Sequence, residues 1–269
     1  MNEPELSWPP LILQEYRSFD LEKKCLNAER LNTHYQLQGN LRFIPEALPC
    51  FLVGRINNAE FILLGLNPAL QKRRLEVESK IYCKKGWEKA SLTFFDWFSE
   101  EGLFSQYYHR FAVFLKGFLS EEKPDKWSRW DRVSRLKMLG ERLVNIDLIP
   151  YHSKGYSLTL IERLKSEPLE GYIENARALI DMNMARVVFV NGRTFKPLLE
   201  RLGFKEEESL SITVNENRGS VLKVRIGEYE GRDGRHRKAV WFEQFLTGRI
   251  AATNQGLYEA GCLIREALE

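Results

Sequence analysis

The sequence predicts an α/β protein in three layers, with helices on both faces of a mostly parallel central sheet of about four strands. Wholly apolar runs such as Phe61-Ile62-Leu63-Leu64 have the length and side chains of strands covered on both faces. Segments with helical spacing separate these runs, which is typical of parallel strands connected by helices. The 269 residues, 43% of them apolar, are enough for a large core. We therefore predict one domain over residues 1–269, with a helical N-terminal extension over about 1–40.

The expected elements follow from hydrophobic periodicity and from the residues that interrupt it. We expect helices over 11–37, 87–119, 172–182, 194–202 and 254–268. Strands are expected from Phe61 onward and over 142–150, 186–191, 221–229 and 238–246. The last two flank Arg232-Asp233-Gly234, a turn typical of a β-hairpin. A proline-broken segment over 40–56, a basic loop over 71–85 and a charged connector over 121–132 complete the chain.

Charge and composition exclude several classes of protein. Lys and Arg outnumber Asp and Glu by only 40 to 37, so net charge alone does not indicate nucleic-acid binding. The four cysteines form no Cys-x-x-Cys pair and no histidine lies at zinc-ligand spacing, which disfavours a metal site. Without an apolar stretch of about 18 residues or an apolar signal core, we expect a cytoplasmic protein with no membrane contact. The sequence leaves the oligomeric state open, and a monomer is the simplest expectation.

Polar residues follow two of the predicted strands where each strand ends. Gly65-Leu66-Asn67-Pro68 comes directly after the first strand, where Gly65 permits a sharp backbone turn and Pro68 fixes φ. Asn145 lies near the end of the second strand, and its amide offers both a donor and an acceptor. Because open α/β sheets bind ligands at the carboxyl ends of their strands, we expect Asn67 and Asn145 to face one pocket. A hydrogen bond to a neighbouring loop is the alternative role for Asn145.

With these motifs the chain resembles the uracil-DNA glycosylase superfamily, in a divergent branch. Residues 43–70, which include FILLGLNPAL, are similar to the lead-in and first motif of branches that carry Gly-x-Asn-Pro. The resemblance implies that Asn67 orients the water that attacks the sugar C1′ and that Asn145 reads the uracil edge. The residues around Asn67 (Gly65, Leu66 and Pro68) would help to hold the base. The implied activity is hydrolysis of the N-glycosidic bond of uracil or a damaged base in DNA, a step of base excision repair that needs no cofactor.

The second catalytic motif departs from the family pattern. The family has a His-Pro-Ser or similar turn after the last strand, whose histidine donates a hydrogen bond to the base oxygen. Residues 243–248 of this chain, EQFLTG, contain neither His nor Pro, and Gln244 is the candidate replacement donor. Loss of one such donor typically costs about 3 kcal/mol of transition-state stabilisation. Tyr82 or Trp87 would stack on the base, and His152 is a further candidate for substrate contact.

Basic residues supply candidate contacts to the DNA backbone, single- or double-stranded. They are Arg73, Arg74, Lys84 and Lys85 in residues 71–85, Arg235, Arg237 and Lys238 in the hairpin tip 231–238, and Arg249 after the last strand. Leu246, Arg249 or Ile250 would be the wedge that fills the gap left by a flipped base. The alternative for both basic stretches is an ordinary solvated surface.

Two other functions remain open on sequence grounds. The missing motif histidine favours a DNA- or nucleotide-binding protein that has kept the fold and lost catalysis. A hydrolase acting on a small nucleoside-like substrate would need neither basic stretch.

Overall fold

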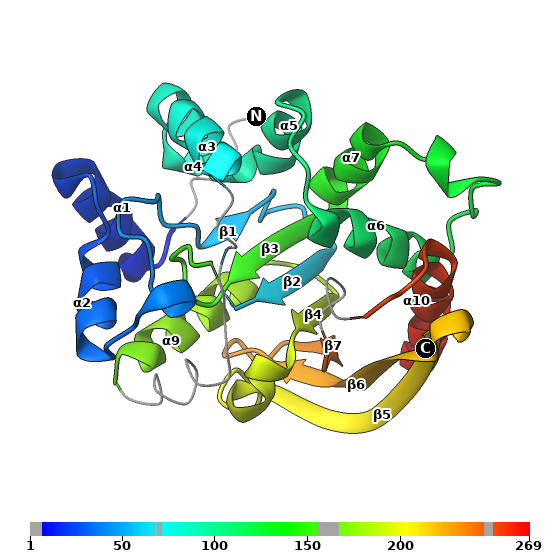
Figure 1. Cartoon of the computed structure of the whole chain (residues 1–269). Coiled ribbons are helices and arrows are strands. Elements are labelled where there is room, and N and C mark those ends of the chain that lie inside the picture. The colour runs from blue at the N-terminus through cyan, green and yellow to red at the C-terminus, as the bar shows by residue number, and fades with distance from the viewer. Residues whose placement is uncertain (1–6, 67, 69–71, 155–166, 245–249) are drawn as a thin grey trace.

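The computed structural model describes residues 7–66, 68, 72–154, 167–244 and 250–269, and its centre is a seven-stranded sheet (Figure 1). The strands are β1 (Leu52–Val53), β2 (Phe61–Gly65), β3 (Leu143–Asp147), β4 (Val187–Asn191), β5 (Phe204–Asn215), β6 (Ser220–Glu230) and β7 (His236–Phe242). Their spatial order is β1-β3-β2-β4-β7-β6-β5. The chain is therefore an α/β protein, as predicted.

The sheet is mixed, with its parallel part in the middle. β3, β2, β4 and β7 run parallel to one another, and β1, β6 and β5 pair antiparallel at the two sides. The hairpin predicted after Tyr229 is confirmed as β6 and β7. The prediction of about four strands is wrong, chiefly because β5 was not recognised. Residues 205–209 of β5 are exposed at the edge of the sheet, and only Ile212 and Val214 in its second half are buried after Phe204, so its apolar pattern is weak.

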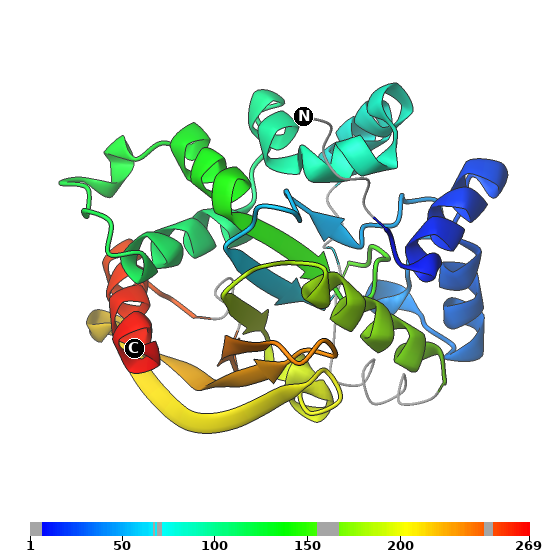
Figure 2. The same cartoon turned by 180° about the vertical axis from the view of Figure 1, so that it is seen from behind.

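Helices cover both faces of this sheet (Figures 1 and 2). The α-helices are α1 (Pro10–Glu22), α2 (Leu26–His34), α3 (Lys72–Lys85), α4 (Trp87–Leu92), α5 (Phe94–Glu100), α6 (Gln106–Phe118), α7 (Arg132–Arg142), α9 (Glu167–Asp181) and α10 (Asn254–Leu268). Short 3₁₀ helices are η1 (Gly39–Leu41), η2 (Trp127–Arg129), η3 (Arg193–Leu198) and η4 (Glu216–Arg218).

The side chains of β2 alternate between two hydrophobic cores. Ile62 and Leu64 enter the core that contains the buried residues of α1, α2 and α9. Phe61 and Leu63 enter the other core, which contains those of α5, α6, α7 and α10. Because successive strand residues point to opposite faces and both faces are covered, every position of this strand is apolar.

Close packing of α6 against α10 closes the second core. A Cβ on Gly117 of α6 would lie 1.9 Å from the backbone oxygen of Tyr258, and one on Gly261 of α10 would lie 2.2 Å from that of Phe114. Only glycine permits backbones to approach so closely. The Thr253 side chain accepts a hydrogen bond from the Gly256 backbone at 2.9 Å and caps α10, whose predicted bounds are confirmed.

Residues 71–85 are helical from Lys72 onward and do not form the predicted loop. The two buried residues of α3 are Arg74 and Glu78, one turn apart, and both are charged. Val77 and Ile81 pack against the second core but are only partly buried. Because charged residues hold the most buried positions, hydrophobic periodicity did not reveal the helix. Residues 194–202 are also not one α-helix: η3 is a 3₁₀ helix that ends at Leu198 and contains Pro197.

The helical N-terminal region is part of the first core. Ile12 of α1 and Ala28 of α2 are fully buried in the same cluster as Leu64 of β2. The Tyr16 hydroxyl donates a hydrogen bond to the backbone oxygen of Pro49 at 2.8 Å. The helices predicted over 11–37 are confirmed, and they pack directly on the body of the protein.

Candidate functional site

The carboxyl ends of three adjacent parallel strands bring Asp147, Gly65 and Asn191 into one row. Gly65 of β2 is paired with Asp147 of β3. On the other side of β2, Leu64 is paired with Val190, so the next residue, Asn191, lies level with Gly65. Residues opposite one another in paired strands project to the same face of the sheet. The row therefore flanks a glycine with a carboxyl group on one side and a carboxamide on the other.

Asn145 and Asp147 form a buried polar pair on β3. The Asn145 amide nitrogen (Nδ2) lies 3.3 Å from Oδ2 of Asp147, and the two residues are 3% and 7% exposed. A Cβ on Gly65 would lie 2.7 Å from Oδ1 of Asp147, the other carboxyl oxygen. Asp147 therefore holds Asn145 with one oxygen and places the other over Gly65, in the space that a side chain on β2 would occupy.

Helix α3 adds a buried ion pair to this end of the sheet. Nε of Arg74 lies 3.6 Å from Oε2 of Glu78, and both side chains are 8% exposed. The Arg74 guanidinium also contacts Sγ of Cys50 at 3.6 Å and lies 5.0 Å from the centroid of the Phe94 ring. Charges this deeply buried are costly unless they are paired, so the pair fixes α3 against the carboxyl ends of the strands.

Burial sets the protonation of the carboxyl groups in this cluster. Burial raises the pKa of Asp147 to about 7, against the opposing effects of the Arg74 charge and the Asn145 hydrogen bond. Burial also raises the pKa of Glu78, which the Arg74 charge partly offsets. For Arg74, burial favours the neutral form, but the Glu78 charge and Cys50 outweigh it and raise its pKa. The site therefore contains a permanent cation and a carboxyl group, Asp147, that changes protonation near neutral pH.

The end of β4 offers an unsatisfied acceptor. Asn191 is 2% exposed, and its Oδ1 has no hydrogen-bond partner among the residues that the structure describes. Oγ1 of Thr194, three residues later, is also buried and makes no hydrogen bond within the described ranges. A buried polar atom that makes no hydrogen bond costs about 1–3 kcal/mol, so such atoms in a native site often await a ligand or water.

The predicted first motif is placed only in part. Gly65, Leu66 and Pro68 are buried at the carboxyl end of β2, as expected for a motif that follows a central strand. Asn67, the predicted water-orienting residue, lies outside the described residues, and so does Arg249. Gln244 is described: it is partly exposed and follows β7, two residues after Phe242, which pairs with Asn191. Gln244 thus lies beyond the carboxyl end of β7, whereas Asn145 is level with Val240 in the middle of that strand.

His152 belongs to the buried cluster around α3. It is 0% exposed, and its Nε2 lies 3.9 Å from Oε2 of Glu78. His152 is therefore enclosed by protein beside the Glu78 carboxyl group.

The predicted stacking aromatics pack against α1. The Tyr82 hydroxyl donates to the Asp20 carboxylate, and its ring stacks on Tyr16 with 6.5 Å between centroids. Trp87 stacks on the same Tyr16 ring at 4.2 Å. In this structure both rings join α3 and α4 to α1. The wedge role considered for Ile250 is contradicted by its burial, since it is 6% exposed in the α6–α10 core.

The basic residues of α3 divide between the surface and the interior. Arg73 and Lys84 are exposed and Lys85 is partly exposed, so they are available to a partner. Arg74 is 7% exposed and paired with Glu78, which contradicts its prediction as a surface contact to DNA. Because residues 71–85 were interpreted as a loop, the burial of Arg74 on one side of a helix could not be predicted.

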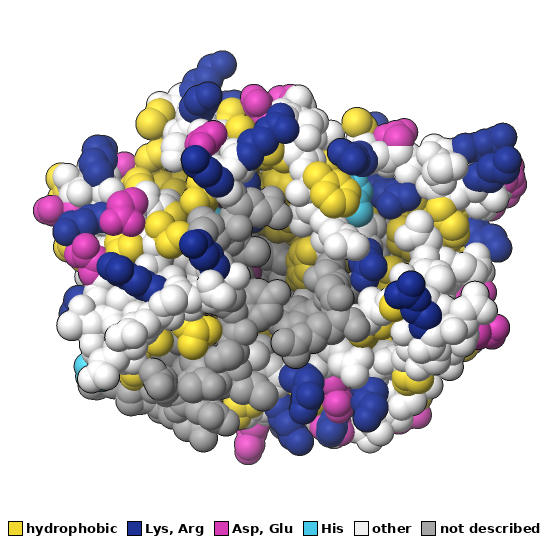
Figure 3. Space-filling model, in the orientation of Figure 1, with side chains coloured by type: hydrophobic (Ala, Val, Ile, Leu, Met, Phe, Trp, Pro, Cys, Tyr) yellow, Lys and Arg dark blue, Asp and Glu magenta, His cyan; other side chains and the backbone are white. Residues whose placement is uncertain are grey.

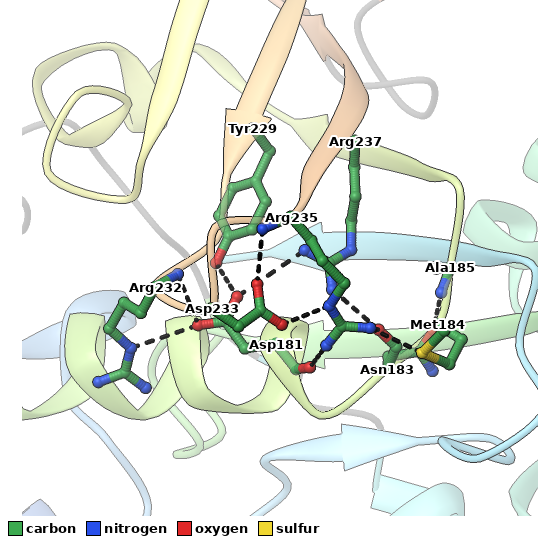
Figure 4. A network of polar contacts seen from close by, with 9 residues as sticks. All are labelled: Asp181, Asn183, Met184, Ala185, Tyr229, Arg232, Asp233, Arg235 and Arg237. Carbon is green, nitrogen blue, oxygen red and sulfur yellow. Dashed lines mark hydrogen bonds and ion pairs between the residues drawn. The ribbon is translucent and has the colours of Figure 1, made fainter.

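The basic hairpin between β6 and β7 is engaged in a polar network with α9 and the residues that follow it (Figure 4). Arg237 is 5% exposed and donates to the Asn183 backbone oxygen at 2.9 Å, so its prediction as a DNA contact is wrong. Arg235 donates to the Asp233 carboxylate and to the Asp181 backbone. Nζ of Lys238 lies 3.7 Å from Oε1 of Glu228. The positive charges of the hairpin are therefore largely matched by protein acceptors.

The hairpin also lies at the other end of the sheet from the row around Gly65. Lys238 of β7 is paired with Val187, the first residue of β4. Val187 is in turn paired with Phe61, the first residue of β2. Gly65 and Asn191 are the last residues of those strands. The two basic stretches predicted to contact one DNA backbone therefore lie at opposite ends of the parallel strands. Of the two, α3 is the one that follows Gly65 in the chain.

One face of the molecule is hollowed near its centre, with Lys and Arg side chains on several sides of the hollow (Figure 3). Three other cavities of about 240, 520 and 610 Å³ lie elsewhere, and none of the three is lined by Asn145, Asp147 or Gly65. Within the described ranges, no group of three or more His, Cys, Asp and Glu side chains could hold a metal ion. None of the described helices is long and apolar enough to cross a membrane.

The chain matches no protein-family model and no curated protein. The function of this site therefore has to be inferred from its own residues.

Sequence reasoning did not identify Asp147, Glu78 or Asn191. Asp147 follows Asn145 by two residues, and strand alternation was sufficient to place both on one face. Asn191 ends an apolar strand just before Gly192, the same signal that identified Gly65. Glu78 had no signal, because its burial depends on how α3 packs.

Proposed function

We propose that this chain is a uracil-DNA glycosylase-like protein that hydrolyses the N-glycosidic bond of uracil or a damaged base in DNA. The observation that carries the proposal is that Asn145 and Asp147 lie on one face of β3 beside the adjacent parallel strand β2, with Asn145 opposite Leu63 and Asp147 opposite Gly65. The residue predicted to read the base is thus held by Asp147 two positions before the level of the first motif. Helices on both faces of a sheet with a parallel centre agree with the three-layer architecture that the resemblance implies.

Each proposed role follows from the chemistry of the residue. Asn145 would read a base edge, because an amide offers both a donor and an acceptor and its position is fixed by Asp147. Asn67 would orient the water that attacks C1′. Bond cleavage places positive character on the sugar and negative charge on the nucleobase. Positioned hydrogen-bond donors can stabilise that negative charge, so the reaction does not need a strong catalytic base.

The exposed basic residues of α3 are the proposed backbone contacts. Arg73 lies in the first turn of the helix that follows the first motif, and Lys84 lies in its last turn, about 16 Å further along the axis. A phosphate bound by Arg73 would therefore be the nearer of the two to a base held at Gly65. Such contacts make affinity fall steeply with salt. The hairpin residues Arg235 and Lys238 are not part of this proposed interface.

The experiment that tests the proposal is base release from uracil-containing oligonucleotides. Single- and double-stranded substrates are incubated with the protein, treated with alkali and examined for cleavage at the abasic site. We expect release that disappears in Asn67→Ala and in Asn145→Ala. The exposed Asn58→Ala is the matched control and should retain full activity.

The same assay separates the two alternatives. DNA retention with a steep salt dependence and no abasic product would indicate a binding protein that has lost catalysis. The absence of the motif histidine from residues 243–248 is the observation that favours this second candidate. A protein that neither retains DNA nor releases base would contradict both functions and favour a small nucleoside-like substrate.

A further inference from the structure

We propose that Asp147, in its protonated form, donates a hydrogen bond to a ring oxygen of the bound base and so supplies the donor that the second motif lacks. This inference rests on the proposed function, because it assigns a role in the same site. It concerns a residue that the resemblance does not include.

One carboxyl oxygen of Asp147 lies against Gly65 at the carboxyl end of β2. Oδ2 accepts from Asn145 at 3.3 Å, whereas Oδ1 lies 2.7 Å from where a Cβ of Gly65 would be. Oδ1 therefore occupies the space that a side chain on β2 would fill, and glycine at this position allows the carboxyl group to lie there. A base that Asn145 reads would lie beside this oxygen, because Asn145 and Asp147 are neighbours on one face of β3.

The surroundings of Asp147 favour the neutral acid. The charged or titratable groups that face it are Arg74 and Glu78 from α3, Cys50 from the segment before β1 and Tyr108 from α6. Arg74 is the permanent cation among them, and it is already paired with Glu78 at 3.6 Å. With that charge shared and the carboxyl buried, the pKa of Asp147 rises to about 7. A neutral carboxylic acid donates a hydrogen bond, which a carboxylate cannot do.

The proposed step balances in atoms and charge. The C1′–N bond breaks and its electron pair leaves with the base, where charge collects on the ring oxygen that accepts from the Asp147 O–H. The water oxygen bonds to C1′ and releases a proton. That proton neutralises the departing base by way of solvent, so the products are the free base and an abasic sugar, and Asp147 remains protonated.

The test measures selective binding as a function of pH. The probe is a labelled single strand that contains one 2′-fluoro-2′-deoxyuridine, in which the fluorine suppresses cleavage. The reference is the same strand with a tetrahydrofuran abasic analogue at that position. The ratio of the two affinities, measured between pH 5.5 and 8.5 at constant ionic strength, removes the contribution of the backbone.

Three proteins give distinct expectations. For the wild type, the preference for uracil should fall about tenfold between pH 6 and pH 8, because the fraction of protonated Asp147 falls by that factor. Asp147→Asn keeps a donor toward Gly65 and an acceptor for Asn145, so its preference should not change with pH. Asp147→Ala should lack the preference at every pH. Circular dichroism at each pH establishes that the variants are folded.

A wild-type preference that is constant with pH, or absent, would overturn the inference without any variant. So would an Asp147→Asn protein that follows the wild-type profile, since Glu78 or another group would then carry the titration. Base release from unmodified substrate is measured in parallel. Release combined with a pH-independent preference removes the role of Asp147 and leaves the proposed function intact. A preference that depends on Asp147 without release supports the inference and contradicts the catalytic activity.

Discussion

The two ends of the parallel strands use charged residues in opposite ways. At the amino ends, the hairpin arginines are paired with acidic side chains and backbone oxygens (Figure 4). The Asp181 carboxylate accepts from Arg232 and from the Tyr229 hydroxyl and lies 3.9 Å from Arg237. At the carboxyl ends, Asp147 is buried with one oxygen over Gly65, and Oδ1 of Asn191 has no partner in the described part of the chain. The first arrangement resembles a structural joint, whereas the second leaves hydrogen-bonding capacity unused. Positive residues close in sequence therefore do not by themselves indicate a nucleic-acid surface.

The largest expected effect is on stability, at the amino-end network. Asp181→Ala removes the acceptor of the Tyr229 hydroxyl, at 2.8 Å, and leaves the buried Arg237 without its carboxylate neighbour. Breaking a buried pair from one side typically costs about 3–5 kcal/mol. We expect a loss of about 3 kcal/mol in the free energy of unfolding by urea. The DNA affinity, measured without urea where the variant is folded, should not change. A loss of DNA affinity in the folded variant would show that the hairpin belongs to the interface.

The next effect concerns pH and the carboxyl ends. The pKa of Asp147 is raised to about 7 in the folded protein, so the native state binds a proton that the unfolded chain releases above about pH 4. The contribution of Asp147 to stability is therefore greatest below about pH 4, falls as the pH rises from about 4 to about 7, and levels off above about pH 8. Asp147→Asn removes this dependence and should raise the free energy of unfolding above pH 8 by an amount on the order of 2 kcal/mol.

Melting temperatures of the wild type and Asp147→Asn, measured from pH 5 to pH 9, check this expectation. The difference between the two proteins should be greatest at the alkaline end and should shrink steadily toward pH 5. A difference that does not change with pH would show that Asp147 is ionised throughout.

A smaller effect tests the space in front of Asp147. Gly65→Ala would place a Cβ 2.7 Å from Oδ1 of Asp147, so the carboxyl group or the strand must shift. We expect a loss of about 1–2 kcal/mol in stability and at least a tenfold loss of preference for the uracil probe. Gly171→Ala is the matched control, because no described atom outside its own helix lies within 4 Å of the added Cβ and the residue is exposed on α9. Equal probe preference in both variants would exclude Gly65 from the binding site.

The smallest effect in free energy distinguishes the two basic stretches. A protein with Lys84→Gln and Lys85→Gln should lower the slope of log affinity against log salt by about one for each phosphate that is no longer neutralised. Lys238→Gln, at the opposite end of the sheet, should leave this slope unchanged. Fluorescence anisotropy with a labelled oligonucleotide at four salt concentrations provides the slopes. The reverse pattern would move the interface to the hairpin.

Local patterns were sufficient for the elements that bury a regular apolar face. The strands at Phe61 and Val187, the hairpin and α10 were predicted because their side chains repeat with the period of the element. The same reasoning missed α3, whose two buried residues are the charged Arg74 and Glu78, and β5, whose first half is exposed. In both elements, the burial pattern depends on neighbours that are distant in the sequence.

The α/β class and the polar residues at the ends of two central strands follow from the amino-acid sequence, because strand length, alternation and turn residues are local properties. The sequence also places Asn145 two positions before Asp147. Which charges are buried depends on tertiary packing. Arginine is a residue type expected at the surface, but Arg74 and Arg237 are buried in this fold. Strand register brings Asp147 over Gly65, and burial then raises its pKa, because desolvation depends on every element packed around the carboxyl group.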